Sequence, residues 1–282
     1  MRAMRLLCLA AAAVAIQPLA PSTVDAQDVQ RFFPGRRYLP RLVAAPREPV
    51  TAAKLVMPFE TPSRFGSILE GEADLGASVP LLVLAGTSLD DAVVLGVEGG
   101  VFATFNMETK ERDLITTDWI FTVPVVLHHE GHWLQVRYFH TSAHLGDEYA
   151  ERFNVERIVY ARDAVETIAY LNPVGDLGLY GGARWSFRVD PPEDKRWAVR
   201  GGLEYEDPSV RTFRAYGAAD IELDQQYGWD PRLNLQVGVR VYTPRDRSTI
   251  RIALEFRTGP SPQGQFGGEH TTHVALGVIL DL

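Results

Sequence analysis

A basic side chain and a nucleophilic side chain lie two residues apart at His140 and Ser142. Residues 132–145 around them alternate between two kinds of side chain, which is the pattern of a β-strand whose faces meet different surroundings. Because a strand repeats its facing every second residue, His140 and Ser142 project from the same face. That face continues as an apolar stripe formed by Leu134, Val136 and Tyr138. The spacing predicts an imidazole placed to take the proton of a serine hydroxyl, which is how serine becomes a nucleophile.

The same stretch has other interpretations. His-x-Ser is a short pattern that arises often by chance, and His and Tyr also anchor proteins at a membrane interface. Asp147 and Glu148 follow the strand, and their carboxylates are either ordinary loop solvation or ligands for a divalent cation such as Ca²⁺. His140 and His144 would stand about 13 Å apart along a strand, too far to share a metal unless the chain turns. A hydrolytic site, a metal site and a structural or binding rim all stay open.

Strand-like alternation extends over most of the chain from about residue 64 and is clearest in its last third. The second face carries Gly, Tyr, Arg, Glu and Ser, as expected for side chains that pair inside a narrow lumen while the apolar face meets lipid. The pattern predicts an all-β fold, a closed antiparallel transmembrane β-barrel of about 12 strands (roughly 10–14), over residues 61–282. The predicted strands span residues 64–71, 78–86, 91–106, 116–128, 132–145, 155–171, 176–189, 195–205, 211–223, 233–242, 249–258 and 271–282.

The connections between the predicted strands give an independent indication of orientation. Longer and shorter connections mostly alternate along the chain, with 190–194 as a short exception. Outer-membrane barrels have short periplasmic turns and longer outer loops, and they typically end in a strand such as 271–282. Counting back from a periplasmic C-terminus, the strand 132–145 runs outward. His140–Glu148 is therefore expected at the outer rim.

The polar face of the predicted barrel is rich in both charges. Opposite charges in a small barrel most often pair across the interior and close it, and a wide aqueous channel usually needs about 16 strands or more. A general porin is therefore disfavoured, whereas a narrow selective pore stays open. The charged residues expected in the lumen are Arg137, Arg162, Arg184, Arg188, Arg200, Arg214, Arg240, Arg251 and Arg257, together with Glu98, Glu166, Glu204, Asp220, Glu222 and Glu255.

The first 26 residues have the pattern of a secretory signal peptide. Arg2 and Arg5 precede an apolar run, and small residues up to Ala26 form a cleavage site. The only cysteine, Cys8, lies in this run, so the mature chain is expected to contain no disulfide or thiol site. The proline-rich residues 27–60 are expected to form an extended segment on the periplasmic side, and the alternative that this segment enters or closes the barrel stays open.

The predicted export and the net charge of the mature chain limit the kinds of partner that we expect. Removing residues 1–26 leaves 26 Lys and Arg against 35 Asp and Glu, a net charge of −9, which argues against a nucleic-acid surface. We expect the mature chain to lie in the bacterial outer membrane, inserted by the barrel-assembly machinery. Its expected partners are membrane lipids and lipopolysaccharide.

Three segments carry a resemblance to a family. Residues 40–44 (Pro-Arg-Leu-Val-Ala), 96–103 (Gly-Val-Glu-Gly-Gly-Val-Phe-Ala) and 140–149 (His-Thr-Ser-Ala-His-Leu-Gly-Asp-Glu-Tyr) resemble a bacterial envelope family known as a domain of unknown function of the 1207 type. The resemblance covers the whole mature chain. It implies an outer-membrane barrel and no particular activity.

The His-x-Ser pattern is also similar to that of outer membrane phospholipase A, a twelve-stranded barrel with this pair on its outward face and an Asn on the next strand. By that resemblance His140 is the base, Ser142 the nucleophile and Asn154 the residue that orients the imidazole. Lipid A deacylases have an acidic residue in the third place. Two departures stand out: Ala143 and His144 follow the serine where the phospholipase has Asn-Gly, and Asn154 would face inward unless a bulge turned it. The calcium ligands of the phospholipase have no counterparts in this sequence.

Overall fold

The computed structural model describes residues 31–32, 38–59, 69–88, 91–209, 212–242 and 249–281. The predicted signal peptide and its cleavage site lie outside these residues. Within them, no helix is long and apolar enough to span a membrane.

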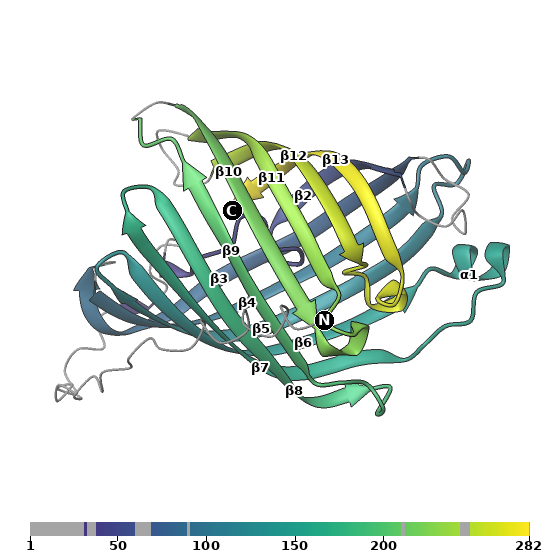
Figure 1. Cartoon of the computed structure of the whole chain (residues 1–282), viewed down its shortest axis with the longest axis horizontal. Coiled ribbons are helices and arrows are strands. Elements are labelled where there is room, and N and C mark those ends of the chain that lie inside the picture. Colours follow the sequence, from purple (N-terminus) through teal and green to yellow (C-terminus); the bar gives the residue numbers. More distant parts are fainter. Residues whose placement is uncertain are drawn as a thin grey trace, which may run out of the picture.

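The fold is a closed antiparallel β-barrel of twelve strands, as predicted (Figure 1). Each strand pairs with its neighbour along the chain, and β13 pairs with β2 to close the wall. A short additional strand, β1 (Arg31–Phe32), pairs with the edge of β3. The barrel strands are β2 (Thr51–Pro58), β3 (Glu70–Ser88), β4 (Asp91–Asn106), β5 (Leu114–His129), β6 (His132–Leu145), β7 (Tyr160–Val174), β8 (Leu177–Asp190), β9 (Trp197–Glu206), β10 (Phe213–Asp224), β11 (Pro231–Tyr242), β12 (Thr249–Pro260) and β13 (His270–Asp281).

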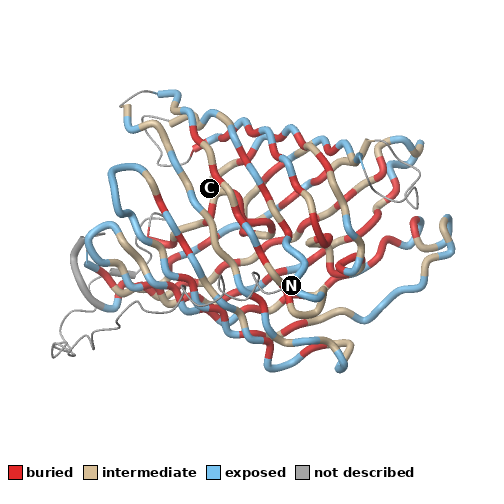
Figure 2. Tube along the Cα trace, in the orientation of Figure 1, coloured by how far each residue is buried: buried red, intermediate tan, exposed pale blue. Residues whose placement is uncertain are grey.

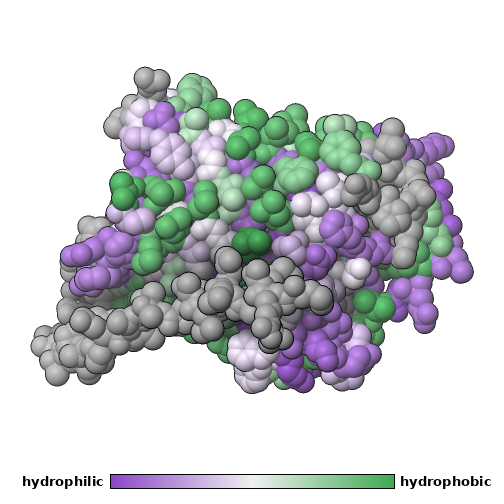
Figure 3. Space-filling model, in the orientation of Figure 1, coloured by the Kyte–Doolittle hydropathy of each residue, from purple (hydrophilic) through white to green (hydrophobic). Residues whose placement is uncertain are grey.

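Buried and exposed residues alternate along the strands (Figure 2). In contrast to a soluble protein, the exposed side chains are mostly apolar and many of the buried ones are polar. Val237, Ile252 and Leu276 face outward and are exposed, whereas Gln236 and Glu255 face inward and are buried. Apolar side chains gather over the strands in the space-filling view, with more polar surface toward the ends (Figure 3). An apolar outer belt around a polar interior is the pattern of outer-membrane barrels.

The start of the barrel differs from the prediction. Its first strand is Thr51–Pro58, inside the segment predicted to be periplasmic, so the barrel begins before residue 61. Most of the predicted strand 64–71 lies outside the described residues, and the predicted strand 78–86 is part of the longer nineteen-residue strand Glu70–Ser88. The alternating sequence pattern of β2 is weak because the strand is short and its inward face holds Lys54. Lys54 pairs with Glu72, Asp74 and Glu255 only once the barrel closes.

The two ends of the barrel are connected differently. The turn end has short links such as Glu130–Gly131, where both residues have positive φ and form a tight hairpin turn. The loop end has longer links, which contain α1 (Asp147–Phe153), η3 (Gln225–Tyr227) and η4 (Gly264–Phe266). In outer-membrane barrels the longer loops lie at the cell exterior. The predicted exception, residues 190–194, is a short link at the loop end.

The lumen is not empty. Residues 38–50, which we call the luminal segment, run inside the barrel, where Tyr38, Leu39, Leu42 and Ala44 are between 1% and 4% exposed. The charged wall residues pair around this segment, as the sequence predicts. Arg137 contacts Glu166 at 2.6 Å, and Glu222 accepts hydrogen bonds from Arg200 at 2.6 Å and from Arg232 at 2.7 Å.

Candidate functional site

The structure places His140 and Ser142 on the outward face of β6. In this strand every even-numbered residue from Leu134 to His144 is exposed or half-buried, and every odd-numbered residue from Gln135 to Leu145 is buried. The two side chains lie in the half of β6 that leads to the loop end. Both positions agree with the strand pattern read from the sequence.

A carboxylate lies behind the imidazole of His140. Asp163 on β7 is the direct ladder neighbour of His140, and its Oδ1 lies 2.8 Å from His140 Nδ1. The hydroxyl of Tyr138 donates to the same oxygen. The His140 side chain is 36% exposed and that of Asp163 is 13% exposed. A proton on Nδ1 satisfies Asp163, so Nε2 is left with the lone pair that a general base requires.

Ser142 lies one step further toward the loop end on the same face. Two positions on a strand are about 7 Å apart between Cα atoms, so the hydroxyl and the imidazole can meet by side-chain rotation. Among the described residues, the Ser142 hydroxyl has no hydrogen-bond partner, so this rotation would break no existing bond. Its ladder neighbours are Trp119 on β5 and Ala161 on β7.

Asn154 is not brought to His140. The chain between β6 and β7 forms α1, and Asn154 is the residue that ends this helix, in the left-handed conformation with φ 51° and ψ 46°. Asn tolerates this conformation well, which suits it to a helix C-terminus. Asp147 and Glu148 lie in the first turn of α1, where their negative charges interact favourably with the positive end of the helix dipole. Asn154 is therefore an exposed helix-ending residue, and the third position beside the imidazole is held by Asp163.

The signal for Asp163 was present in the strand pattern. If Arg162 and Glu166 face the lumen, Asp163 must face outward, where a carboxylate among apolar side chains is unusual. Cross-strand register, which the pattern of one strand does not contain, was needed to pair it with His140.

Arg188 differs from its prediction as a lumen residue. The β7–β8 ladder pairs Asp163 with Arg188 but Ala164 with Ser186, so β8 carries one extra residue as a β-bulge. The bulge reverses the facing of the last part of β8, and Arg188 points outward with 69% of its side chain exposed. Its Nη1 lies 3.8 Å from Asp163 Oδ2, and its Nη2 lies 3.5 Å from Asp190 Oδ2. A cation therefore lies beside the His140–Asp163 pair.

Aromatic side chains surround this group on the outer wall. Trp and Tyr side chains are enriched where a barrel wall passes from hydrocarbon to head groups, so the group lies at the expected depth of that interface. The exposed aromatic residues on β5, β6, β8 and the start of β9 are Trp119, Phe121, Tyr138, Trp185, Phe187 and Trp197.

Asp147 and Glu148, the candidate metal ligands, lie on a helix and not in a cluster of carboxylates among the described residues. Asp147 and Glu148 are exposed on α1, and Asp147 pairs with Arg157. No group of three or more His, Cys, Asp or Glu side chains in the described ranges is arranged to hold a metal ion. In the part of the chain that the structure describes, Asp147 and Glu148 therefore do not belong to a Ca²⁺ site.

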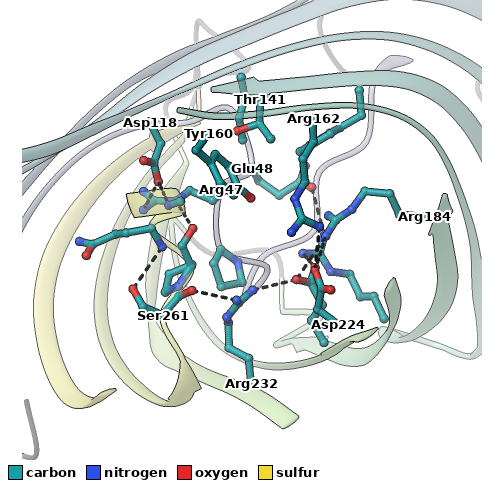
Figure 4. Close-up of a pocket in the computed structure, with 18 of the residues that line it drawn as sticks. Arg47, Glu48, Asp118, Thr141, Tyr160, Arg162, Arg184, Asp224, Arg232 and Ser261 are labelled. Carbon is teal, nitrogen blue, oxygen red and sulfur yellow. Dashed lines mark hydrogen bonds and ion pairs between the residues drawn. The ribbon is translucent and has the colours of Figure 1, made fainter. Parts of the chain in front are cut away.

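A second cluster of charged groups lines a cavity inside the barrel (Figure 4). Arg162, Arg184 and Arg232 converge there on Glu222 and Asp224. These guanidinium groups are buried and each has at least one carboxylate partner. The cluster is an ion-pair network that ties strands together across the lumen.

Comparison with known proteins supports the fold. Outer membrane phospholipase (OMPLA) of Salmonella typhi, solved as a dimer with bound calcium, matches with a TM-score of 0.58 and 12% identity over 87% of this chain and 95% of that chain. Outer membrane phospholipase A from Escherichia coli matches with a TM-score of 0.56 and 12% identity over 84% and 93%. No curated protein sequence matches the chain. The family expected from the sequence is confirmed, because the model described as "Protein of unknown function (DUF1207)" matches residues 27–281 and the chain thus belongs to that family.

Proposed function

We propose that this outer-membrane barrel is a lipid-facing acyl-ester hydrolase, with Ser142 as nucleophile, His140 as general base and Asp163 as the residue that orients the imidazole. The observation that carries the proposal is the 2.8 Å contact between His140 Nδ1 and Asp163 Oδ1 on the outward face, two residues from Ser142. The phospholipase resemblance suggested Asn154 for this role, and the acidic third residue of the lipid A deacylases is the better parallel.

The reaction would proceed in two steps. Ser142 Oγ attacks the ester carbonyl carbon while His140 Nε2 takes the hydroxyl proton, and the same proton then passes to the leaving alkoxide as the acyl-enzyme forms. In the second step His140 Nε2 takes a proton from water as the water oxygen attacks the acyl carbon. The bond from that carbon to Ser142 Oγ then breaks, and the proton passes from Nε2 to Oγ as the fatty acid leaves. Asp163 stays ionised throughout and stabilises the imidazolium.

The surroundings of the site fit a membrane substrate. The outward face opens toward lipid, so an ester near the head groups could arrive laterally without leaving the membrane. Tyr138 holds Asp163 from the side, and Arg188 places a positive charge next to the carboxylate. A positive charge beside the site would favour the oxyanion that develops during attack.

The test is hydrolysis by the detergent-folded protein, measured on phospholipids and on lipid A. We expect fatty-acid release that Ser142→Ala abolishes. The matched control is Thr167→Ala, which removes a hydroxyl from an outward position of the neighbouring strand β7. Activity that survives Ser142→Ala, or an inactive wild type in both assays, would reject the proposal.

The alternative is a non-enzymatic barrel, either structural or narrowly conducting. The filled lumen favours the structural form in the conformation described here, because the luminal segment and its ion pairs occupy the interior. This alternative predicts a protein without esterase activity whose outward His140 and Ser142 can be replaced without functional loss.

A further inference from the structure

The luminal segment forms a loop that enters and leaves the barrel at the same end. At its start, His128 Nε2 donates to the carbonyl of Tyr38 at 3.0 Å, close to the β5–β6 turn. At its finish, Thr51 begins β2 opposite Leu280, also at the turn end. The tip of the loop is Arg47, which has a positive φ of 68° and reaches the carbonyl of Pro262 in a loop at the other end.

Two charged residues hold the tip. Glu48 Oε1 lies 3.1 Å from Arg137 Nη2 and 4.0 Å from Arg200 Nη1. Arg47 Nη2 lies 2.8 Å from Asp118 Oδ2, and its guanidinium stacks over the Phe102 ring at 5.0 Å. These ion pairs join the segment to strands β5, β6 and β9 of the wall.

The middle of the segment is held through its backbone. The Val43 N–H donates to Glu204, and the Val43 carbonyl accepts from Arg251 at 3.2 Å. Asn234 donates to the carbonyl of Ala44. Backbone groups in an irregular segment need partners when they are buried, and here wall side chains provide them. Water could take over each of these partners, so the segment could leave without stranding a polar group in apolar surroundings.

Cavities lie on both sides of the segment. The cavity toward the loop end has about 670 Å³ of empty space, counting the part open to solvent, and Pro46, Arg47 and Glu48 form part of its lining (Figure 4). A second cavity at the turn end has about 410 Å³ of empty space, again counting the part open to solvent, and is lined by Val43 and by wall residues that include Glu206. Val43 thus lines one cavity, and Pro46, Arg47 and Glu48 line the other, so the segment stands between the two.

We infer that the luminal segment is a removable plug, and that the barrel is a channel for small ions that this plug closes. The inference concerns the interior, so it does not depend on the hydrolase proposed for the outer wall. Both ends of the loop emerge at the turn end, so the segment can withdraw in that direction without threading the chain. Withdrawal would join the two cavities into one aqueous path.

The test is ion conductance through planar lipid bilayers. The wild type is expected to be silent. Glu48→Ala is expected to produce discrete conductance steps because it removes the carboxylate that joins the tip of the segment to Arg137 and Arg200. A truncated chain that begins at residue 49 should conduct persistently. The matched control is Glu156→Ala, an exposed loop carboxylate, which should remain silent. Heat-dependent mobility in gel electrophoresis reports whether each variant has a folded barrel.

A reversible lock separates plug release from damage to the wall. The only cysteine, Cys8, precedes the barrel, so Ala44→Cys with Asn234→Cys adds one defined pair to the protein refolded from residue 27. Combined with Glu48→Ala, this pair should abolish the steps when oxidised and restore them when reduced. Steps that persist after oxidation, or silence in both the Glu48→Ala and the truncated protein, would overturn the inference.

Discussion

The outer wall and the lumen of this barrel both pair basic side chains with carboxylates, but to different extents. In the lumen, Arg137 is 3% exposed and contacts three carboxylates, those of Glu48, Glu98 and Glu166. On the outer wall, His140 is 36% exposed and contacts Asp163 through one ring nitrogen. A group whose hydrogen-bonding capacity is fully used supports the structure, whereas a group held on one side retains an atom for chemistry. We therefore expect a reaction on the outer wall rather than in the lumen.

The largest expected effect separates two histidines on one strand face. His140→Ala should lower hydrolysis by about 1000-fold or more, because it removes the base that activates the serine. His144→Ala removes a neighbouring outward imidazole that no carboxylate of the described residues contacts, and the rate of this variant should stay near that of the wild type. Initial rates on a detergent-solubilised phospholipid would measure both. Equal losses in the two variants would remove the distinction between these histidines.

The next effect concerns stability and compares a buried with an exposed arginine. Arg137→Ala leaves Glu48, Glu98 and Glu166 without their shared partner and should destabilise the barrel by about 3–5 kcal/mol. Arg157→Ala removes an exposed ion pair with Asp147 and should cost less than about 1 kcal/mol. Urea unfolding of the protein in lipid vesicles would give both values. Similar costs for both substitutions would contradict the structural role assigned to the lumen network.

A smaller effect tests which residue orients the imidazole. Asp163→Asn keeps the shape of the side chain but favours the wrong tautomer of His140, and should lower kcat by about 100-fold or more. Asn154→Ala should leave kcat unchanged, because Asn154 ends α1 in the loop. The reverse ranking would restore the assignment suggested by the phospholipase resemblance.

The smallest expected effect is that of Tyr138→Phe. It removes the hydroxyl that donates to Asp163, and the loss of one hydrogen bond to a charged group is worth about 1.5–3 kcal/mol when the group is fully buried. Asp163 retains some solvent access, so the decrease in kcat should be near or below the lower end of that range, about 10-fold. A decrease as large as that of Asp163→Asn would give Tyr138 a direct role in the reaction.

Much of this arrangement could be predicted from sequence because a strand has a side-chain period of two. The facing of His140, Ser142 and Arg137 follows from alternation alone, as does the gathering of opposite charges on the inner face of the barrel. Alternation fails where an extra residue interrupts the period. The bulge at Phe187 turns Arg188 from the lumen to the outer wall. The residue types around Phe187 do not predict a bulge at this position.

The sequence by itself determined the barrel, its approximate strand number, the inside and outside of its wall and the outward position of His140 and Ser142. Only the tertiary structure decided that Asp163 stands behind the imidazole, that Asn154 ends a helix and that residues 38–50 fill the lumen. The reason is physical: facing depends on the local chain, whereas register between strands and the filling of a closed space depend on partners far away in sequence.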